Sequence, residues 1–193
     1  MNKYETFLLQ DQSEFTIFLS TIKNEGVKSY LEIGSKHGGS FWRISNALPP
    51  GSRVVSVDLP HGDTSFKESE PHLKACVDAL KKKGYDAHLF IGDSTDAGVV
   101  ERVRRLAPFD LIFIDANHTE PYVWNDWRNY GPMSGKIVAF HDIGHINLPH
   151  KTKKMPIDVP KVWNKIKHLY RHREIRFCPA SNGIGILWMS QQI

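Results

Sequence analysis

Short apolar runs alternate with amphipathic stretches along most of the chain. The apolar runs predict five strands, at residues 29–34, 53–59, 87–92, 110–115 and 136–141. The last three runs are almost continuously apolar, which is typical of strands buried on both faces of a parallel sheet. Stretches with helical spacing predict helices at residues 13–23, 39–48, 68–83, 96–106 and 120–130. This alternation predicts an α/β fold with a doubly wound, mostly parallel sheet.

The pattern changes after His141. Residues 143–160 are rich in Gly, Pro, His and Lys and predict a long loop of the kind that usually has a function. A helix is predicted at residues 159–170, followed by strands at 174–178 and 183–189. The turn-rich sequence PASNG between these two strands predicts a C-terminal antiparallel hairpin. The sheet would then have about seven strands within a single domain.

Composition agrees with one globular domain. The chain has 193 residues, of which 40% are hydrophobic and 24% are charged, so it can bury one sizeable core. We expect no membrane span, because no run of about 18 apolar residues occurs. We expect no export either, because no signal-peptide core is present. Two cysteines without a CxxC motif, Cys76 and Cys178, suit free thiols in a reducing, cytoplasmic environment.

The net charge of +4 is unevenly distributed. Residues 1–135 hold 15 Lys and Arg against 18 Asp and Glu, whereas residues 136–193 hold 10 against 3. Such a basic third can attract an acidic ligand, a nucleic acid or an anionic partner. It can also be a solvated face, which is the simpler interpretation.

A glycine-rich turn, LEIGSKHGGS at residues 31–40, joins the first strand to the next helix. Such a turn lets a ligand approach the backbone and offers amides at a helix N-terminus. It lacks the GK[ST] ending of a phosphate-binding loop, and Lys36 makes it a poor dinucleotide motif. The acidic Glu32 favours a ligand with an ammonium group over one with a pyrophosphate. A purely structural turn is the alternative.

Acidic residues also end the second and third strands. Asp58 follows Gly34 by 24 residues, close to the spacing of about 20 at which an acid accepts ribose hydroxyls in the dinucleotide fold. Asp93 follows the third strand, where it could meet an adenine. With the loop, these acids indicate a nucleoside ligand; a helix N-cap is the alternative for each.

Further polar side chains gather at the ends of the fourth and fifth strands. Asp115, Asn117 and His118 follow the fourth strand, and His141 and Asp142 end the fifth. Open α/β sheets bind ligands at the carboxyl ends of their strands, so we expect Asp115 and Asp142 to converge. Oxygen-rich clusters of this type suit Mg²⁺, Mn²⁺ or Ca²⁺. A strand-end cap or turn former is the alternative for each residue taken alone.

These motifs together resemble the class I S-adenosylmethionine-dependent methyltransferases. LEIGSKHGGS is similar to the family's first motif, VVSVDLP to its second and GDS to its third. The segment FDLIFIDANHTEPYVWNDWRNYGPMSGKIVAFHDI is the most specific match. It resembles a small branch with an FIDxxH…HDI signature that includes macrocin-type sugar O-methyltransferases and cephalosporin-hydroxylase-like proteins. The resemblance covers roughly residues 29–143 and implies a Rossmann-like fold and S-adenosyl-L-methionine as cofactor.

The resemblance also implies roles for individual residues. The residues expected to bind the cofactor are Glu32, Gly34, Ser35, Gly38, Ser40, Asp58, Asp93 and Asp115. Metal-dependent relatives imply Mg²⁺ or Mn²⁺ at Asp115 and Asp142, with His141 as a third ligand in place of an acid. Asn117 stands where some relatives carry a catalytic aspartate, so His118 and His141 are the remaining candidates for a base.

Methyl transfer from a sulfonium is an in-line displacement that depends mainly on positioning. A hydroxyl acceptor additionally needs a base, or a metal that lowers its pKa. We therefore expect transfer to a hydroxyl of a small molecule, such as a sugar or a natural-product scaffold. Residues 143–160 would form a substrate lid, whose KTKK segment at 151–154 would favour an anionic acceptor.

Two other classes of protein stay open. One is a nucleoside-binding α/β protein that transfers no methyl group, with Asn117 and His141 marking a degenerate site. The other is a nucleic-acid methyltransferase or binder that uses the basic C-terminal third. The absence of a [DN]PP[YF] motif after the fourth strand argues against methylation of a base nitrogen, and we do not expect nucleic acid as the partner. A homo-oligomer also stays open.

Overall fold

The computed structural model describes residues 8, 10–60, 69–144, 156–177 and 181–192. Its strands are β1 (Ser29–Ile33), β2 (Arg53–Asp58), β3 (Asp86–Ile91), β4 (Phe109–Ile114), β5 (Ser134–His141), β6 (Tyr170–Ile175) and β7 (Ile184–Gln192). Its α-helices are α1 (Gln12–Asn24), α2 (Gly39–Ala47), α3 (Ser69–Lys82), α4 (Ala97–Arg104), α5 (Glu120–Tyr130) and α6 (Val159–Ile166). No helix in these ranges is both long and apolar enough to cross a membrane.

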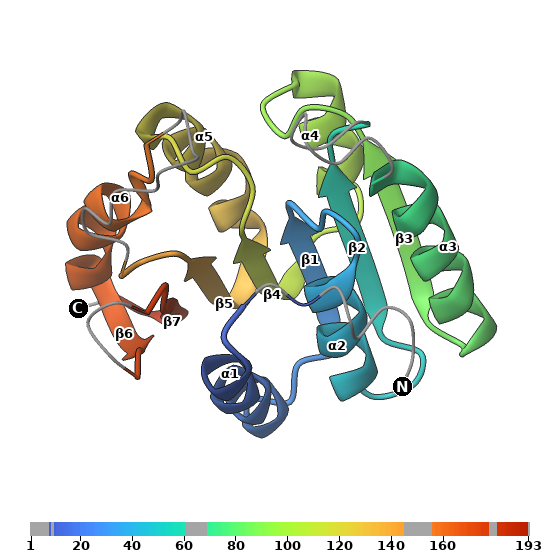
Figure 1. Cartoon of the computed structure of the whole chain (residues 1–193), viewed down its shortest axis with the longest axis horizontal. Helices are drawn as coiled ribbons and strands as arrows, with labels where there is room; N and C mark the ends of the chain where they lie inside the picture. Colours follow the sequence, from blue (N-terminus) through green and yellow to red (C-terminus); the bar gives the residue numbers. More distant parts are fainter. Residues whose placement is uncertain (1–7, 9, 61–68, 145–155, 178–180, 193) are drawn as a thin grey trace.

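The strands form one sheet with the order β3-β2-β1-β4-β5-β7-β6 (Figure 1). Strands β1 to β5 pair in parallel, whereas β7 pairs antiparallel with both β5 and β6. The predicted α/β fold, its mostly parallel sheet and its C-terminal antiparallel hairpin are therefore confirmed. The strand order reverses between β1 and β4, which is where open α/β sheets form a ligand crevice.

Helices cover both faces of the sheet (Figure 1). One buried cluster joins the sheet to α1, α2 and α3, and the second joins it to α4, α5 and α6. Side chains alternate along β1, so Tyr30 belongs to the first cluster and Leu31 to the second. Because both faces are buried, the central strands need the continuous apolar runs seen in the sequence.

The C-terminal boundaries differ from the prediction. The helix α6 ends at Ile166 and is followed by one 3₁₀ turn, and β6 begins at Tyr170 instead of residue 174. Residues Arg171 to Glu174 are exposed on the outermost strand of the sheet. An exposed edge strand carries no apolar alternation, so the pattern could not reveal its start. Cys76 is a buried free thiol, as expected, whereas Cys178 lies outside the described residues.

Candidate active site

The glycine-rich loop passes directly over the end of β4. Gly34 has a φ of +88°, which glycine adopts without strain. A Cβ at this position would lie 2.3 Å from the carbonyl oxygen of Asp115. The backbone amide of Asp115 also donates to the carbonyl of Ile33 at 2.9 Å. Glycine is therefore required here because the loop and the end of β4 are in backbone contact.

Asp58, at the end of β2, holds the same loop from the other side. Its Oδ2 accepts hydrogen bonds from the backbone amides of Ser35 and Lys36. Lys36 has a φ of +53°, in the left-handed region. Burial raises the pKa of Asp58 although these amides oppose the shift. The residue predicted to bind a ribose thus also shapes the loop.

The loop leads into the N-terminus of α2. Gly38, with a φ of +84°, precedes the first helical residue, and no side chain caps the helix there. A Cβ on Gly38 would lie 3.2 Å from the Sγ of Cys76 on α3, so the fit is tight. Uncapped amides and the positive end of the helix dipole suit an anionic group of a ligand.

Glu32 is fully buried on β1, beside the loop. Its two carboxylate oxygens accept hydrogen bonds from the hydroxyls of Tyr30 and Ser40, which tie β1 to the first turn of α2. Burial raises the pKa of Glu32 to about 8; Ser40 and Tyr30 oppose this shift, and the charges of Asp115 and Asp58 add to it. A cation nearby would favour the ionised carboxylate.

Asp93 closes the turn after β3. Its Oδ1 accepts from the backbone amide and from the hydroxyl of Thr95, both at 2.8 Å. The N-cap of α4 is Asp96, whose side chain accepts from the amide of Val99 at 2.9 Å. The alternative interpretation of Asp93 as a helix N-cap is therefore wrong.

A buried acid that the sequence analysis missed lies close to this turn. Asp126 on α5 is fully buried, and no hydrogen bond from a described residue reaches either of its carboxylate oxygens. Tyr130, one turn further along α5, donates its hydroxyl to the carbonyl of Ser94 at 2.8 Å. The spacing of Val123, Asp126 and Tyr130 matches one helix face, a signal that could have placed Asp126 inside.

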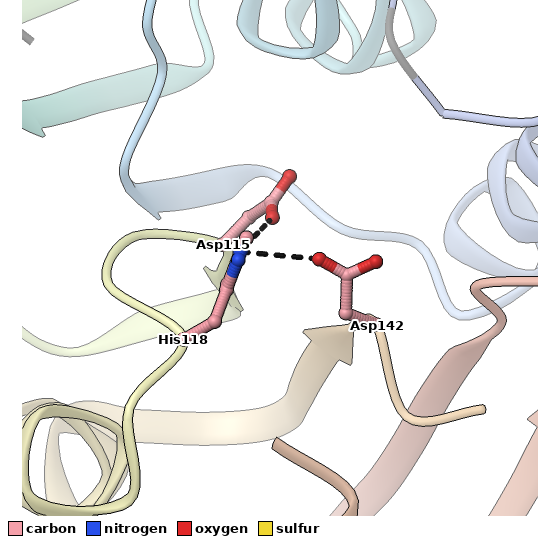
Figure 2. Close-up of side chains that lie close together, drawn as sticks. All are labelled: Asp115, His118 and Asp142. Atoms are coloured by element: carbon pink, nitrogen blue, oxygen red, sulfur yellow. Dashed lines mark hydrogen bonds and ion pairs between the residues drawn. The ribbon is translucent and has the colours of Figure 1, made fainter. Parts of the chain in front are cut away.

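Asp115, His118 and Asp142 converge at the ends of β4 and β5 (Figure 2). The Nε2 of His118 lies 3.4 Å from Oδ1 of Asp115 and 3.1 Å from Oδ2 of Asp142. One ligand atom of each residue lies within 4.8 Å of the others. Asp142 has a φ of +60°, an uncommon backbone conformation that often occurs at functional sites.

His141 contacts the same carboxylates from the end of β5. Its Nδ1 lies 3.2 Å from Oδ1 of Asp115 and 3.5 Å from Oδ1 of Asp142. Burial alone would lower its pKa, but the two carboxylates raise the pKa of His141 to about 10. Burial opposes the ionised form of Asp115, but His141 and His118 hold its pKa well below the usual range.

Asn117 has a structural role in the loop before α5. Its Oδ1 accepts from the backbone amide of Thr119 at 2.9 Å and from the Thr119 hydroxyl at 2.8 Å. These bonds fix the turn that presents the next side chain, His118. The carbonyl of Asn117 is thus engaged within the loop, whereas the ring of His118 is at the cluster.

Gln10 was not predicted to be part of the site. Its Nε2 donates to Oδ2 of Asp115 at 2.6 Å, across 105 positions of sequence. It lies immediately before Asp11, the N-cap of α1. The helical pattern of α1 is visible in the sequence, but nothing in it shows that the residue before this helix reaches the end of β4.

A hollow of about 350 Å³ lies away from these residues, between the end of α1 and the strands β6 and β7. Arg171 and Trp188 line it, with the guanidinium 4.6 Å from the indole ring centre. The cluster of Asp115, His118 and Asp142 lies instead at the carboxyl ends of the parallel strands β4 and β5. We therefore place the candidate site at these strand ends, because the reactive side chains, and not the volume of a hollow, locate an active site.

The strand order, the glycine-rich loop after β1 and the acids at successive strand ends define a Rossmann-like methyltransferase fold. A family model described as a methyltransferase domain matches residues 31–143, which is more than half of the chain. The protein belongs to this methyltransferase domain family. The search of curated proteins found no match.

Solved structures with the same fold include three methyltransferases. An O-methyltransferase from Bacillus cereus in complex with SAH has a TM-score of 0.69 and 16% identity, covering 95% of this chain and 84% of that chain. The O-methyltransferase TomG from Streptomyces achromogenes, involved in tomaymycin synthesis and in complex with SAM, has a TM-score of 0.68 and 18% identity, covering 97% and 90%. The SAH-bound methyltransferase PaMTH1 from Podospora anserina has a TM-score of 0.58 and 19% identity, covering 96% and 84%.

Proposed function

We propose that the protein transfers a methyl group from S-adenosyl-L-methionine to a hydroxyl of a small molecule, such as a sugar or a natural-product scaffold. The observation that carries this proposal is the convergence of Asp115, His118 and Asp142 beside the glycine-rich loop. The structural relatives support it, because two are O-methyltransferases and all three were solved with SAM or SAH.

The loop fits such a cofactor. The N-terminus of α2 has no side-chain cap, so its backbone amides can receive the cofactor's carboxylate. Glu32 lies below the loop with a raised pKa, and a cationic sulfonium and ammonium would stabilise its ionised form. Asp58 and Asp93, at the next two strand ends, would lie along the nucleoside part.

The cluster also fits a divalent cation. Its donor set is two carboxylates and one imidazole, with one ligand atom of each within 4.8 Å of the others. Mg²⁺ prefers oxygen ligands, and the imidazole shifts the preference toward Mn²⁺. When bound, the cation would lower the pKa of the acceptor hydroxyl. Asp115, His118 and Asp142 would hold it, so His118 takes the place expected for His141.

The two histidines would then differ in their roles. While no cation is bound, the carboxylates of Asp115 and Asp142 raise the pKa of His141 to about 10, so its ring is protonated at neutral pH, which suits neutralising the two acids and does not suit a base. His118 has one electron pair at Nε2, so it either binds the cation or accepts the hydroxyl proton. A His118→Ala variant that loses Mn²⁺ affinity identifies a ligand, and one that loses only turnover identifies a base.

Most of the predicted lid, residues 145–155, lies outside the described residues, and only its flanks are described. Ile143 is buried directly after the cluster, and Gly144 donates its amide to the carbonyl of Asn182 at 2.7 Å. On the other flank, the amide of Asp158 donates to the carbonyl of His118 at 2.7 Å. Of the two flanks, the one at Asp158 is therefore joined directly to a residue of the cluster, His118. The KTKK lysines, at residues 151–154, lie outside the described residues.

An acceptor screen tests the proposal. The full chain, with labelled S-adenosylmethionine, is offered hydroxyl and amine acceptors in the presence of Mg²⁺, Mn²⁺ or a strong chelator. We expect turnover on hydroxyls that falls in the chelator and in His118→Ala, but not in the exposed control His168→Ala. Turnover only on amines contradicts a hydroxyl acceptor, and full activity in chelator contradicts the cation. Absence of any binding heat with SAH contradicts the cofactor itself.

A further inference from the structure

The helix α1 is fixed firmly against the sheet, and this sets the place of Gln10. Asp11 caps the helix by accepting from the backbone amides of its first turn. Glu14 is fully buried, and its carboxylate accepts from the amides of Phe177 and Gly183, both at 3.1 Å. The bonds of Glu14 join α1 to the ends of β6 and β7 and so fix the place of the helix on the sheet. The position of Gln10, one residue before the N-cap, is therefore fixed as well.

Gln10 contacts one oxygen of Asp115. Gln10 donates to Oδ2 at 2.6 Å, whereas the ring nitrogens of His141 and His118 lie 3.2 Å and 3.4 Å from Oδ1. The two oxygens thus have different partners. A carboxylate restrained through one oxygen presents the other in a fixed direction, here toward His118 and Asp142 (Figure 2).

The rest of the Gln10 amide has no structural use in the described part of the chain. Its Oε1 is buried and has no hydrogen-bond partner there. An unpaired buried carbonyl opposes folding, so a native structure that keeps one next to functional groups calls for an explanation. The cap of α1 does not supply that explanation, because Asp11 makes its bonds without Gln10.

We propose that Gln10 is a positioning residue, which fixes Asp115 so that Oδ1 is directed at the divalent cation. The inference rests on the cation of the proposed function. Hydrogen bonds to a ligating carboxylate commonly change metal affinity by about 10–100-fold. Gln10 would act only through Asp115 and would leave the cofactor loop untouched.

The test is a titration of the full chain with Mn²⁺, followed by electron paramagnetic resonance of the free ion. Gln10→Met keeps the length of the side chain and removes the donor. We expect it to weaken Mn²⁺ binding by about 10–100-fold and to leave SAH affinity and the unfolding temperature unchanged. Gln12→Met, a matched change at an exposed position two residues on, should leave all three unchanged.

Equal Mn²⁺ affinity in the wild type and Gln10→Met overturns the inference alone. Loss of SAH affinity and of thermal stability in Gln10→Met also overturns it, because the residue would then be merely structural. A wild type that binds SAH but no Mn²⁺ overturns the cation and this role with it. A wild type that binds Mn²⁺ but neither SAH nor any acceptor contradicts methyl transfer, while the comparison of the two variants still decides the role of Gln10.

Discussion

Asp58 Oδ2 accepts a 2.7 Å hydrogen bond from the backbone amide of Ser35, across 23 positions of sequence. The bond joins the end of β2 to the glycine-rich loop after β1, and Lys36 adds a second amide to the same oxygen. Hydrogen bonds that involve an ionised group are about twice as strong as neutral ones. The loop conformation therefore depends on the charge of this carboxylate as well as on its glycines.

Removing that charge should weaken cofactor binding. In Asp58→Asn the loop loses a charge-assisted bond, and the ribose would lose an ionised acceptor. We expect the affinity for SAH, measured by calorimetry, to fall by about 10–100-fold, which is about 1.4–2.8 kcal/mol. Asp78→Asn, on the exposed side of α3, is the matched control and should bind as the wild type does. Unchanged affinity in Asp58→Asn would remove Asp58 from the binding site.

Two glycines with similar backbone angles should respond differently to alanine. Gly34 and Gly26 have φ values of +88° and +60°, so both substitutions carry backbone strain of about 1 kcal/mol. Only at Gly34 would the new Cβ meet backbone, 2.3 Å from the carbonyl oxygen of Asp115; at Gly26 nothing lies within 4 Å. We expect Gly34→Ala to lower the free energy of unfolding in urea by more than about 3 kcal/mol, and Gly26→Ala by about 1 kcal/mol. Equal losses of unfolding free energy in the two variants would show that the backbone can shift at little cost to remove the clash between residue 34 and Asp115.

Cofactor binding should release a proton from Glu32. With a pKa of about 8, this buried carboxyl is mostly protonated at pH 7. The positive charges of S-adenosylmethionine would lower its pKa, so up to about one proton leaves on binding. Calorimetry at pH 7 in buffers of different ionisation enthalpy should therefore give different binding enthalpies for the wild type. For Glu32→Gln the enthalpy should not depend on the buffer. A wild type without buffer dependence would argue that the cofactor's charges are remote from Glu32.

The parallel part of the fold was predictable because each of its strands and helices has a recognisable pattern of apolar residues within its own segment. The strands β4 and β5 are mostly buried and have apolar runs, as predicted, and α5 has the predicted ends, residues 120 and 130. The third predicted strand, β3, also has an apolar run, but it lies at an edge of the sheet and is only half-buried. The start of β6 was missed because its residues are exposed at the sheet edge and carry Arg, His and Glu. An exposed strand does not need apolar residues, so the hydrophobic pattern cannot show where it begins.

The candidate site was predictable as far as strand ends determine it. Asp115 and Asp142 end neighbouring parallel strands, so their convergence follows from topology. The direction of a loop side chain does not follow from topology, so the sequence did not show that His118 lies with Asp115 and Asp142 as a possible ligand. Gln10 reaches the site from a segment 105 positions away. Contacts of that kind depend on how a helix docks, which no local pattern specifies.

Asp126 should make the protein less stable as pH rises. Burial raises the pKa of this carboxyl to about 7; the nearby side chain of Ser94 opposes the shift, and the charge of Asp93 adds to it. The unfolded chain loses this proton near pH 4. Between about pH 4 and pH 7 the folded state therefore binds more protons than the unfolded state, and stability falls with rising pH. Above pH 7 both states are ionised, and the loss stays constant.

The substitution Asp126→Asn isolates this effect, because asparagine has nearly the same shape and does not ionise. The free energy of unfolding of the variant, relative to that of the wild type, should increase by about 2–3 kcal/mol as pH rises from 5 to 8. Urea denaturation at pH 5, 6, 7 and 8 measures the difference. Contributions from Glu32 and the histidines are common to both proteins and cancel. Asp78→Asn, exposed on α3, is the control and should show no pH-dependent difference from the wild type. A difference between Asp126→Asn and the wild type that is constant across this range would mean that Asp126 is already ionised at pH 5 in the folded protein.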